Sequence, residues 1–119
     1  MVDDRATLLD IVLACRRIER FLAGIGEPQF RADEEKRWAV VSQLSMIGEA
    51  VRRLSESFRG QHAPVPWRQI AGMRDRLIHA YDKIDWPLVW HTAQSDVPKL
   101  LAELESFVPA SDESTDESE

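Results

Sequence analysis

Cysteine is almost absent from the sequence. The 119-residue chain contains one, Cys15, so it can form neither an intrachain disulfide nor a cluster of thiolates around a metal. Cys15 lies within an apolar pattern of helical spacing, and we interpret it as a buried core thiol. The three histidines are scattered, and the sequence contains no glycine-rich phosphate loop. These features indicate no metal and no other cofactor.

Long hydrophobic runs are missing as well. No apolar stretch approaches the roughly 20 residues that a helix needs to cross a bilayer. The N-terminus has neither the basic start nor the cleavage site of a secretory signal. With 44% hydrophobic and 30% charged residues, the composition is that of a soluble globular protein, and the length suggests one domain. We expect a cytoplasmic protein that does not enter a membrane.

Acidic residues are concentrated at the C-terminal end of the chain. Residues 110–119 hold five of the 21 acids and no base, so 16 acids remain against 15 bases in the rest of the chain. The net charge of −6 therefore does not argue against a nucleic-acid ligand. Twelve of the fifteen bases are arginines, which favour bidentate contacts with anions. We expect residues 1–108 to form the folded domain and residues 109–119 to be a disordered acidic tail.

Apolar residues recur at helical spacing in four segments: 3–23, 33–58, 67–81 and 86–107. Three of these segments begin near an aspartate that favours an N-cap: Asp3 or Asp4, Asp33, and Asp85. Pro98 lies inside the last segment and should either kink it or divide it near residues 94–96. Four helices with short connections predict an all-α, antiparallel four-helix bundle.

The connections and the second helix carry further structural expectations. Residues 30–32 and 59–65 are predicted loops, with His62 exposed. Gly48 lowers the stability of the second helix by about 1 kcal/mol relative to alanine, so we expect another helix to pack closely against it. Glu49 beside it is either buried against an arginine or exposed, and the sequence does not separate these alternatives.

Most of the polar chemistry lies in residues 73–81, which read MRDRLIHAY. The planar guanidinium of Arg74 matches the oxygens of a phosphate, and the imidazole of His79 can move a proton near neutral pH. Together they suit transesterification at an RNA phosphodiester, in which the 2′-hydroxyl is the nucleophile and no metal is required. Tyr81 adds a hydroxyl beside them, as a ligand contact or as a target of covalent modification.

The spacing of these residues constrains how they can meet. On a helix Asp75 and His79 are about one turn apart, so the carboxylate can orient the imidazole. Arg74 and His79 are about 140° apart on an ideal helix. They converge only if the helix end is distorted or if a second copy completes the site across a dimer axis. Such residues more often form a surface ion pair and a histidine with satisfied hydrogen bonds, and spacing alone leaves this alternative open.

Several segments resemble one known family. Residues 74–81 resemble the R-x4-H-x-Y signature of the HepT-type toxins of the HEPN superfamily, with Asp75 at a position that is often asparagine there. Residues 47–50 (IGEA) and 66–74 (PWRQIAGMR) resemble segments that precede this signature. Residues 81–85, followed by Val89 and Trp90, resemble the segment after it. The resemblance covers roughly residues 5–107, with the segments in the family's order.

This resemblance implies a metal-independent endoribonuclease that acts as the toxin of a type VII-like toxin–antitoxin system. Arg74 and His79 match the catalytic positions of the family, and Asp75 would support them. RNA would be the substrate, and we expect a homodimer in which two such sets face one cleft. A cognate nucleotidyltransferase antitoxin would neutralise the toxin by transferring AMP to Tyr81.

Two other interpretations remain at this stage. The first is a non-catalytic helical partner of a nucleotidyltransferase, which binds RNA or a nucleotide without cutting. The second is a purely structural bundle, which the clustering of polar residues at one helix end makes less attractive. Turnover that depends on His79 separates the ribonuclease from both.

Overall fold

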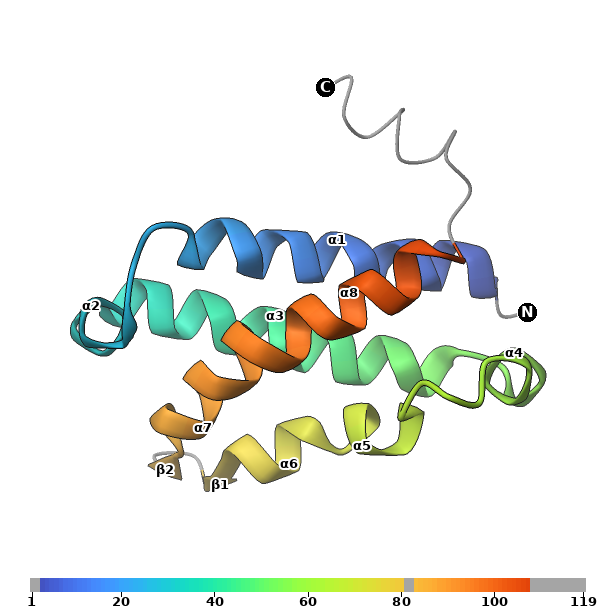
Figure 1. The fold of residues 1–119 in the computed structure, drawn as a ribbon. Coiled ribbons are helices and arrows are strands. Elements are labelled where there is room, and N and C mark those ends of the chain that lie inside the picture. The colour runs from blue at the N-terminus through green and yellow to red at the C-terminus, as the bar shows by residue number, and fades with distance from the viewer. Residues whose placement is uncertain (1–2, 81–82, 108–119) are drawn as a thin grey trace.

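Two long helices, α1 (Asp4–Leu22) and α3 (Glu34–Arg53), lie side by side along the protein (Figure 1). The computed structural model describes residues 3–80 and 83–107. Each long helix begins at an aspartate. The Asp3 side chain accepts hydrogen bonds from two backbone N–H groups of the first turn, at 3.1 and 3.2 Å, and Asp33 accepts one from Lys36 at 3.0 Å. The N-caps predicted at these two positions are confirmed.

The core lies where these two helices meet the last helical segment. Many of its largest fully buried side chains come from the predicted apolar stripes: Ile11, Ile18, Val40, Leu44, Ile47, Val51 and Leu104. Cys15 is fully buried among them, and burial raises the pKa of its thiol to about 12. The interpretation of Cys15 as a core thiol is confirmed. Among the helices that the structure describes, none is both long and apolar enough to span a membrane.

Two short helices differ from the sequence prediction. Helix α2 (Glu27–Ala32) replaces the predicted loop at 30–32, and the second predicted helix breaks before α4 (Glu56–Gln61). At this break the Ser55 hydroxyl accepts a 3.1 Å hydrogen bond from the N–H of Phe58 and donates one of 2.6 Å to Asp4. Ser55 thus starts a new helix and ties it to α1, so the prediction of one helix as far as residue 58 is wrong.

The predicted exposure of His62 is also wrong. Its ring is half-buried, with its centroid 4.6 Å from that of Phe58 and 3.9 Å from that of Phe107. Its carbonyl oxygen accepts a 3.0 Å hydrogen bond from the indole of Trp67. His62 therefore packs as one of the rings that close this end of the bundle.

The last helical segment changes its hydrogen-bond pattern along its length. Helix α7 (Trp86–His91) passes through a π-helical turn, η1 (Thr92–Asp96), into α8 (Val97–Glu105) (Figure 1). Pro98 has no N–H for the carbonyl four residues earlier, and its ring crowds that carbonyl. The wider π turn accommodates both effects. The irregularity predicted near residues 94–96 is present, as a π turn between two α-helical parts.

The third predicted helix is divided. Helix α5 (Trp67–Ala71) ends at Gly72, and α6 (Met73–Leu77) leads into an antiparallel pair of strands, β1 (Ile78–Ala80) and β2 (Lys83–Ile84). Gly48 of α3 packs against α5, since a Cβ there would lie 3.4 Å from two carbonyl oxygens of α5, those of residues 70 and 71. The close packing predicted at Gly48 is confirmed, whereas Glu49 is exposed.

Taken together, α1, α3, α5–α6 and α7–α8 make up the all-α bundle that the sequence predicts (Figure 1). The predicted end of the folded domain at residue 108 and the acidic tail at 109–119 lie outside the described residues.

Candidate functional site

Helix α6 ends at Leu77, so the predicted helix through residue 81 is wrong, and His79 lies on strand β1. Ile78 adopts an extended backbone (φ −120°, ψ 98°) and pairs with Ile84, and both side chains are half-buried against the core. The carbonyl oxygen of Leu77 accepts a 2.9 Å hydrogen bond from the N–H of Asp85. In a continuing helix this oxygen would accept from the residue four positions later, so the hairpin replaces the last helical turn.

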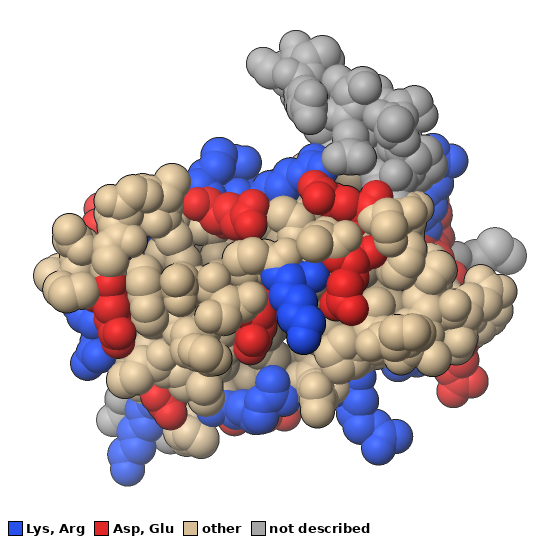
Figure 2. Space-filling model, viewed as in Figure 1, with Lys and Arg blue, Asp and Glu red and all other residues tan. Residues whose placement is uncertain are grey.

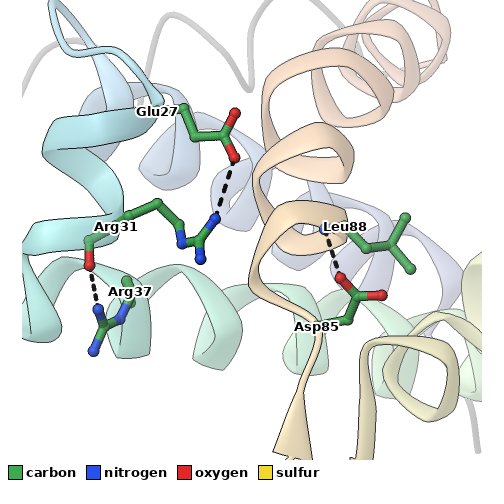
Figure 3. Close-up of polar contacts among 5 residues, drawn as sticks. All are labelled: Glu27, Arg31, Arg37, Asp85 and Leu88. Atoms are coloured by element: carbon green, nitrogen blue, oxygen red, sulfur yellow. Dashed lines mark hydrogen bonds and ion pairs between the residues drawn. The ribbon is translucent and has the colours of Figure 1, made fainter.

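Asp85 also fixes the far side of the hairpin. Its side chain accepts a 3.1 Å hydrogen bond from the N–H of Leu88 in the first turn of α7 (Figure 3). The N-cap predicted at Asp85 is confirmed. A single residue therefore joins the end of α6 to the start of α7, and the strand that carries His79 is held between two helices.

The candidate side chains that the structure describes are open to solvent. Arg74 and Asp75 lie on α6 with 53% and 74% of their side chains exposed, and Arg74 Nη1 lies 3.9 Å from Asp75 Oδ1. His79 is exposed, whereas its strand neighbour Ile78 is half-buried. Because successive side chains of a strand point to opposite faces, His79 points away from the core. Arg74 and His79 thus lie before and after one helix end, both accessible to a large ligand.

The end of α6 at Leu77 changes the relative directions of Arg74 and His79. A distorted helix end was one of the two arrangements that the spacing allowed for Arg74 and His79. Asp75 pairs with Arg74, and within residues 3–80 and 83–107 no hydrogen bond joins it to His79. The orientation of His79 by Asp75 stays a prediction. Tyr81 lies outside the described residues.

Arginines outnumber acids in the segment that leads into the helix end, although the protein as a whole is acidic. Residues 59–80 hold four arginines and one acid, Asp75. Arg68, Arg74 and Arg76 are exposed on α5 and α6, and we call them the basic strip. Basic side chains recur along the lower edge of the molecule, where these two helices lie (Figure 2). Exposed arginines are the side chains that make bidentate contacts with the phosphates of a polyanion.

A groove of about 320 Å³ lies between α5–α6 and the last helical segment. Its apolar lining includes Ile70, Met73, Val97 and Leu100, and Arg76 of the basic strip also lines it. Neither Arg74 nor His79 belongs to its described lining, so the candidate pair lies on an open surface beside the groove. In the part of the chain that the structure describes, no group of three His, Cys, Asp or Glu residues is placed to hold a metal ion.

The sequence of the chain is similar to those of known proteins. The family model described as "Ribonuclease HepT-like" matches residues 11–107. The "Probable ribonuclease HepT" of Thermococcus cleftensis is 39% identical over 100 residues, which cover 84% of this chain and 91% of the relative. The "Putative RNase TTE0752" of Caldanaerobacter subterraneus subsp. tengcongensis is 35% identical over 108 residues, 91% of this chain and 96% of the relative. No solved structure matches the chain significantly.

Proposed function

The chain belongs to the HepT-like ribonuclease family, and we propose that it is an endoribonuclease in which Arg74 and His79 act on an RNA phosphodiester without a metal ion. The observation that supports this assignment is the break at Leu77. It sets an exposed histidine on a hairpin directly beyond the helix that carries an exposed arginine. A surface site of this kind is open to a long polymer.

In the proposed reaction His79 removes the proton of a ribose 2′-hydroxyl, and the 2′-oxygen attacks the adjacent phosphorus. The pentavalent transition state carries additional negative charge on its oxygens, which the paired N–H donors of Arg74 stabilise. The bond to the 5′-oxygen of the next nucleotide then breaks, and that oxygen takes up a proton. The products are a 2′,3′-cyclic phosphate and a 5′-hydroxyl, so no water enters this step.

The basic strip supplies the contacts that hold the RNA backbone. Arg68 and Arg76 lie on the same two short helices as Arg74. Arg76 Nη1 donates a 2.8 Å hydrogen bond to the carbonyl oxygen of Gln69, which fixes its side chain along the surface. Contacts of arginine with phosphates position a nucleic acid without reading its sequence. We expect Arg76→Ala to weaken RNA binding. The slope of log binding constant against log salt concentration should become shallower by about one unit.

A homodimer completes the proposed site. Arg74 and His79 lie on an open surface, and a second copy placed over the helix end supplies the missing wall and a second pair of the same residues. Arg74 of one copy can then hold the phosphate while His79 of the other accepts the 2′-hydroxyl proton and returns it to the leaving oxygen. Mixing Arg74→Ala with His79→Ala protomers tests this arrangement, since a site shared between protomers regains activity in the mixed dimer.

The proposed biological setting is a toxin–antitoxin pair in the cytoplasm. A nucleotidyltransferase partner would transfer AMP to Tyr81, two residues beyond His79 in the sequence. The added phosphate would repel the RNA backbone and compete for the arginines of the basic strip. Under this proposal Tyr81→Phe stays active in the presence of the partner and ATP, whereas the wild-type protein loses activity and gains the mass of AMP.

The experiment that tests the activity uses purified protein, shown by mass to be unmodified, with single-stranded and structured RNAs in EDTA. His79→Ala and Arg74→Ala should not cleave. Two matched controls, His91→Ala and Arg52→Ala, remove exposed residues of the same types elsewhere and should cleave like the wild type. All four positions are exposed, so each variant should retain its free energy of unfolding to within about 0.5 kcal/mol. Binding without cleavage by the wild type would instead identify a non-catalytic partner.

A further inference from the structure

A cluster of aromatic rings lies at the start of α3 and α7. The Trp38 and Trp86 rings meet edge to face, with centroids 5.6 Å apart and an interplanar angle of 88°. Phe30 lies behind them, 6.4 Å from Trp86 and 5.4 Å from Trp90. Phe30 is fully buried, whereas Trp38 is 47% exposed. A rigid, packed base of rings therefore supports one large ring surface that is open to solvent.

Arg37 is fixed beside this surface by a contact with a ring and a contact with a backbone carbonyl. Its guanidinium lies 4.9 Å from the centroid of the Trp86 ring, and it donates a hydrogen bond to the carbonyl oxygen of Arg31 (Figure 3). Arg31 itself pairs with Glu27 at 3.6 Å. Among the described residues, no carboxylate lies within ion-pair distance of Arg37. The guanidinium thus lies against the half-buried Trp86 ring, which in turn packs against the exposed Trp38 indole, and an exposed indole backed in this way is a suitable surface for a nucleobase.

This surface is close to the candidate site. Trp86 follows β2 by two residues, and Ile84 of β2 pairs with Ile78, the neighbour of His79. Standard backbone and strand spacings therefore place the Cα atoms of Trp86 and His79 at most about 17 Å apart. At about 3.4 Å for each stacked nucleotide, this separation corresponds to about five nucleotides or fewer. One RNA strand can reach both places.

The charges near Trp38 select the part of a nucleotide that binds there. Glu34 and Glu35 precede Trp38 by about one helical turn, and both are exposed. Two carboxylates on this side of α3 repel a phosphate, while a nucleobase is uncharged and has a π face of its own. We propose that Trp38 stacks an unpaired base of the RNA strand whose phosphate lies at Arg74 and His79, with the Trp86 ring, over which Arg37 lies, supporting the indole.

The proposal rests on the proposed ribonuclease function and adds a substrate class, single-stranded RNA. A base can stack on a protein ring only when it is unpaired and turned out of a helix. The competing occupant of this surface is a protein, either a second copy or a partner. Met46, the other large apolar side chain exposed on α3 among the described residues, lies about two turns further along and is 41% exposed. A protein interface along α3 would involve both residues, whereas a base platform involves Trp38 alone.

The test measures binding of two chains of equal length to the intact protein: a 2′-O-methyl oligoadenylate and the same chain without bases. The 2′-O-methyl group removes the nucleophile, so binding is read without cleavage. Wild-type protein should bind the oligoadenylate more tightly than the abasic chain. Trp38→Leu should weaken oligoadenylate binding by about 5- to 140-fold and leave abasic binding unchanged, since it removes the π face. Trp38→Phe should retain most of the affinity, and Met46→Ala all of it.

Three outcomes would overturn the proposal. The first is equal binding of the two chains by the wild type. The second is a Trp38→Leu protein of native circular dichroism that binds both chains like the wild type, or loses affinity for both equally. The third is a change of oligomeric state in both Trp38→Leu and Met46→Ala, which would assign the surface to a protein. The ribonuclease proposal is tested separately by the His79 dependence of cleavage, so the failure of one proposal can be told from the failure of the other.

Discussion

The backbone N–H of Asp85 lies 2.9 Å from the carbonyl oxygen of Leu77, and this hydrogen bond joins the end of one helix to the approach of the next. The Asp85 side chain meanwhile accepts from Leu88 and caps α7. Between Leu77 and Asp85 the described residues 78–80 and 83–84 form the strands β1 and β2, and His79 lies on β1. The proposed catalytic histidine is thus positioned by a strand pair that two hydrogen bonds of Asp85 hold in place, and not by a helix face.

Removing the Asp85 cap should make the position of the strand that carries His79 less fixed. Asp85→Ala should lower the free energy of unfolding by about 1 kcal/mol, the usual cost of an N-cap. It should reduce cleavage by about 10-fold or more, because displacement of a reacting group by about 1 Å costs roughly 100-fold. Denaturant unfolding and initial cleavage rates measure the two effects.

Asp3→Ala is the matched control for this variant. It removes the cap of α1, which begins at the other end of the bundle (Figure 1). A similar loss of stability with a wild-type cleavage rate is the expected result. Equal cleavage rates in Asp85→Ala and the wild type would show that the cap does not position His79.

The contact between α3 and α5 should limit the size of residue 48. A Cβ on Gly48 would lie 3.4 Å from two carbonyl oxygens, which is van der Waals contact, so Gly48→Ala should keep its free energy of unfolding within about 1 kcal/mol of wild type. Gly48→Leu forces α5 away and should destabilise by about 1–3 kcal/mol or more. Gly60→Leu is the control, because its Cβ position has no described atom within 4 Å outside its chain neighbours and its own helix backbone, and it should be tolerated. Equal effects of the two leucines would contradict the packing argument.

Some features of the fold could be predicted from the sequence, and others could not. The caps at Asp33 and Asp85, the buried Cys15 and the close packing at Gly48 were predictable, because each follows from residue type and local spacing. The break at Leu77 was not, since its cause is a hydrogen bond to a residue eight positions later and the packing of Ile78 against Ile84. Local propensity contains no information about either contact.

The aromatic cluster and Ser55 show the same limit. Trp38 and Trp86 are 48 positions apart in the sequence, and no periodicity relates them. Ser55 ends a helical pattern that would otherwise continue, because it bonds to Asp4 at the far end of the sequence. For the site, the residue types and the motif of Arg74 and His79 were visible in the sequence, whereas the strand that carries His79 and its exposed surroundings were visible only in the fold.

The contact between Asp4 and Ser55 predicts a pH dependence of stability. The Ser55 hydroxyl and backbone N–H donate to the Asp4 carboxylate at 2.6 and 2.8 Å and hold its pKa below the ordinary value of 3.8. A pKa that is lower in the folded state stabilises the fold above the unfolded pKa, and this contribution is lost as the pH falls through the folded pKa. Asp4→Asn should therefore be less stable than wild type at pH 5–7, and the difference should shrink below pH 4.

Urea unfolding of both proteins across this range measures the effect. Ser55→Ala removes the stronger of the two donors, so the pH-dependent effect of Asp4→Asn should be smaller in the Ser55→Ala background than in the wild-type background. A difference in stability that is independent of pH would show that the carboxylate charge does not contribute.

Cys15 should be unreactive in the folded protein. Burial raises its thiol pKa to about 12, and the thiolate is the form that reacts with alkylating agents. Iodoacetamide at pH 8 should label the protein only in proportion to its unfolded fraction, so labelling should rise along the denaturant unfolding curve. Rapid labelling without denaturant would contradict the buried position.

The most direct test of the account is the chemistry of the RNA ends left by the unmodified protein in EDTA. If Arg74 and His79 promote attack by the 2′-hydroxyl, the fragments carry 2′,3′-cyclic phosphate and 5′-hydroxyl ends. A single 2′-O-methyl group at the cut position then blocks cleavage there, and His79→Ala yields no fragments. Fragments with 3′-hydroxyl and 5′-phosphate ends, or cleavage that persists in His79→Ala, would contradict the proposed mechanism.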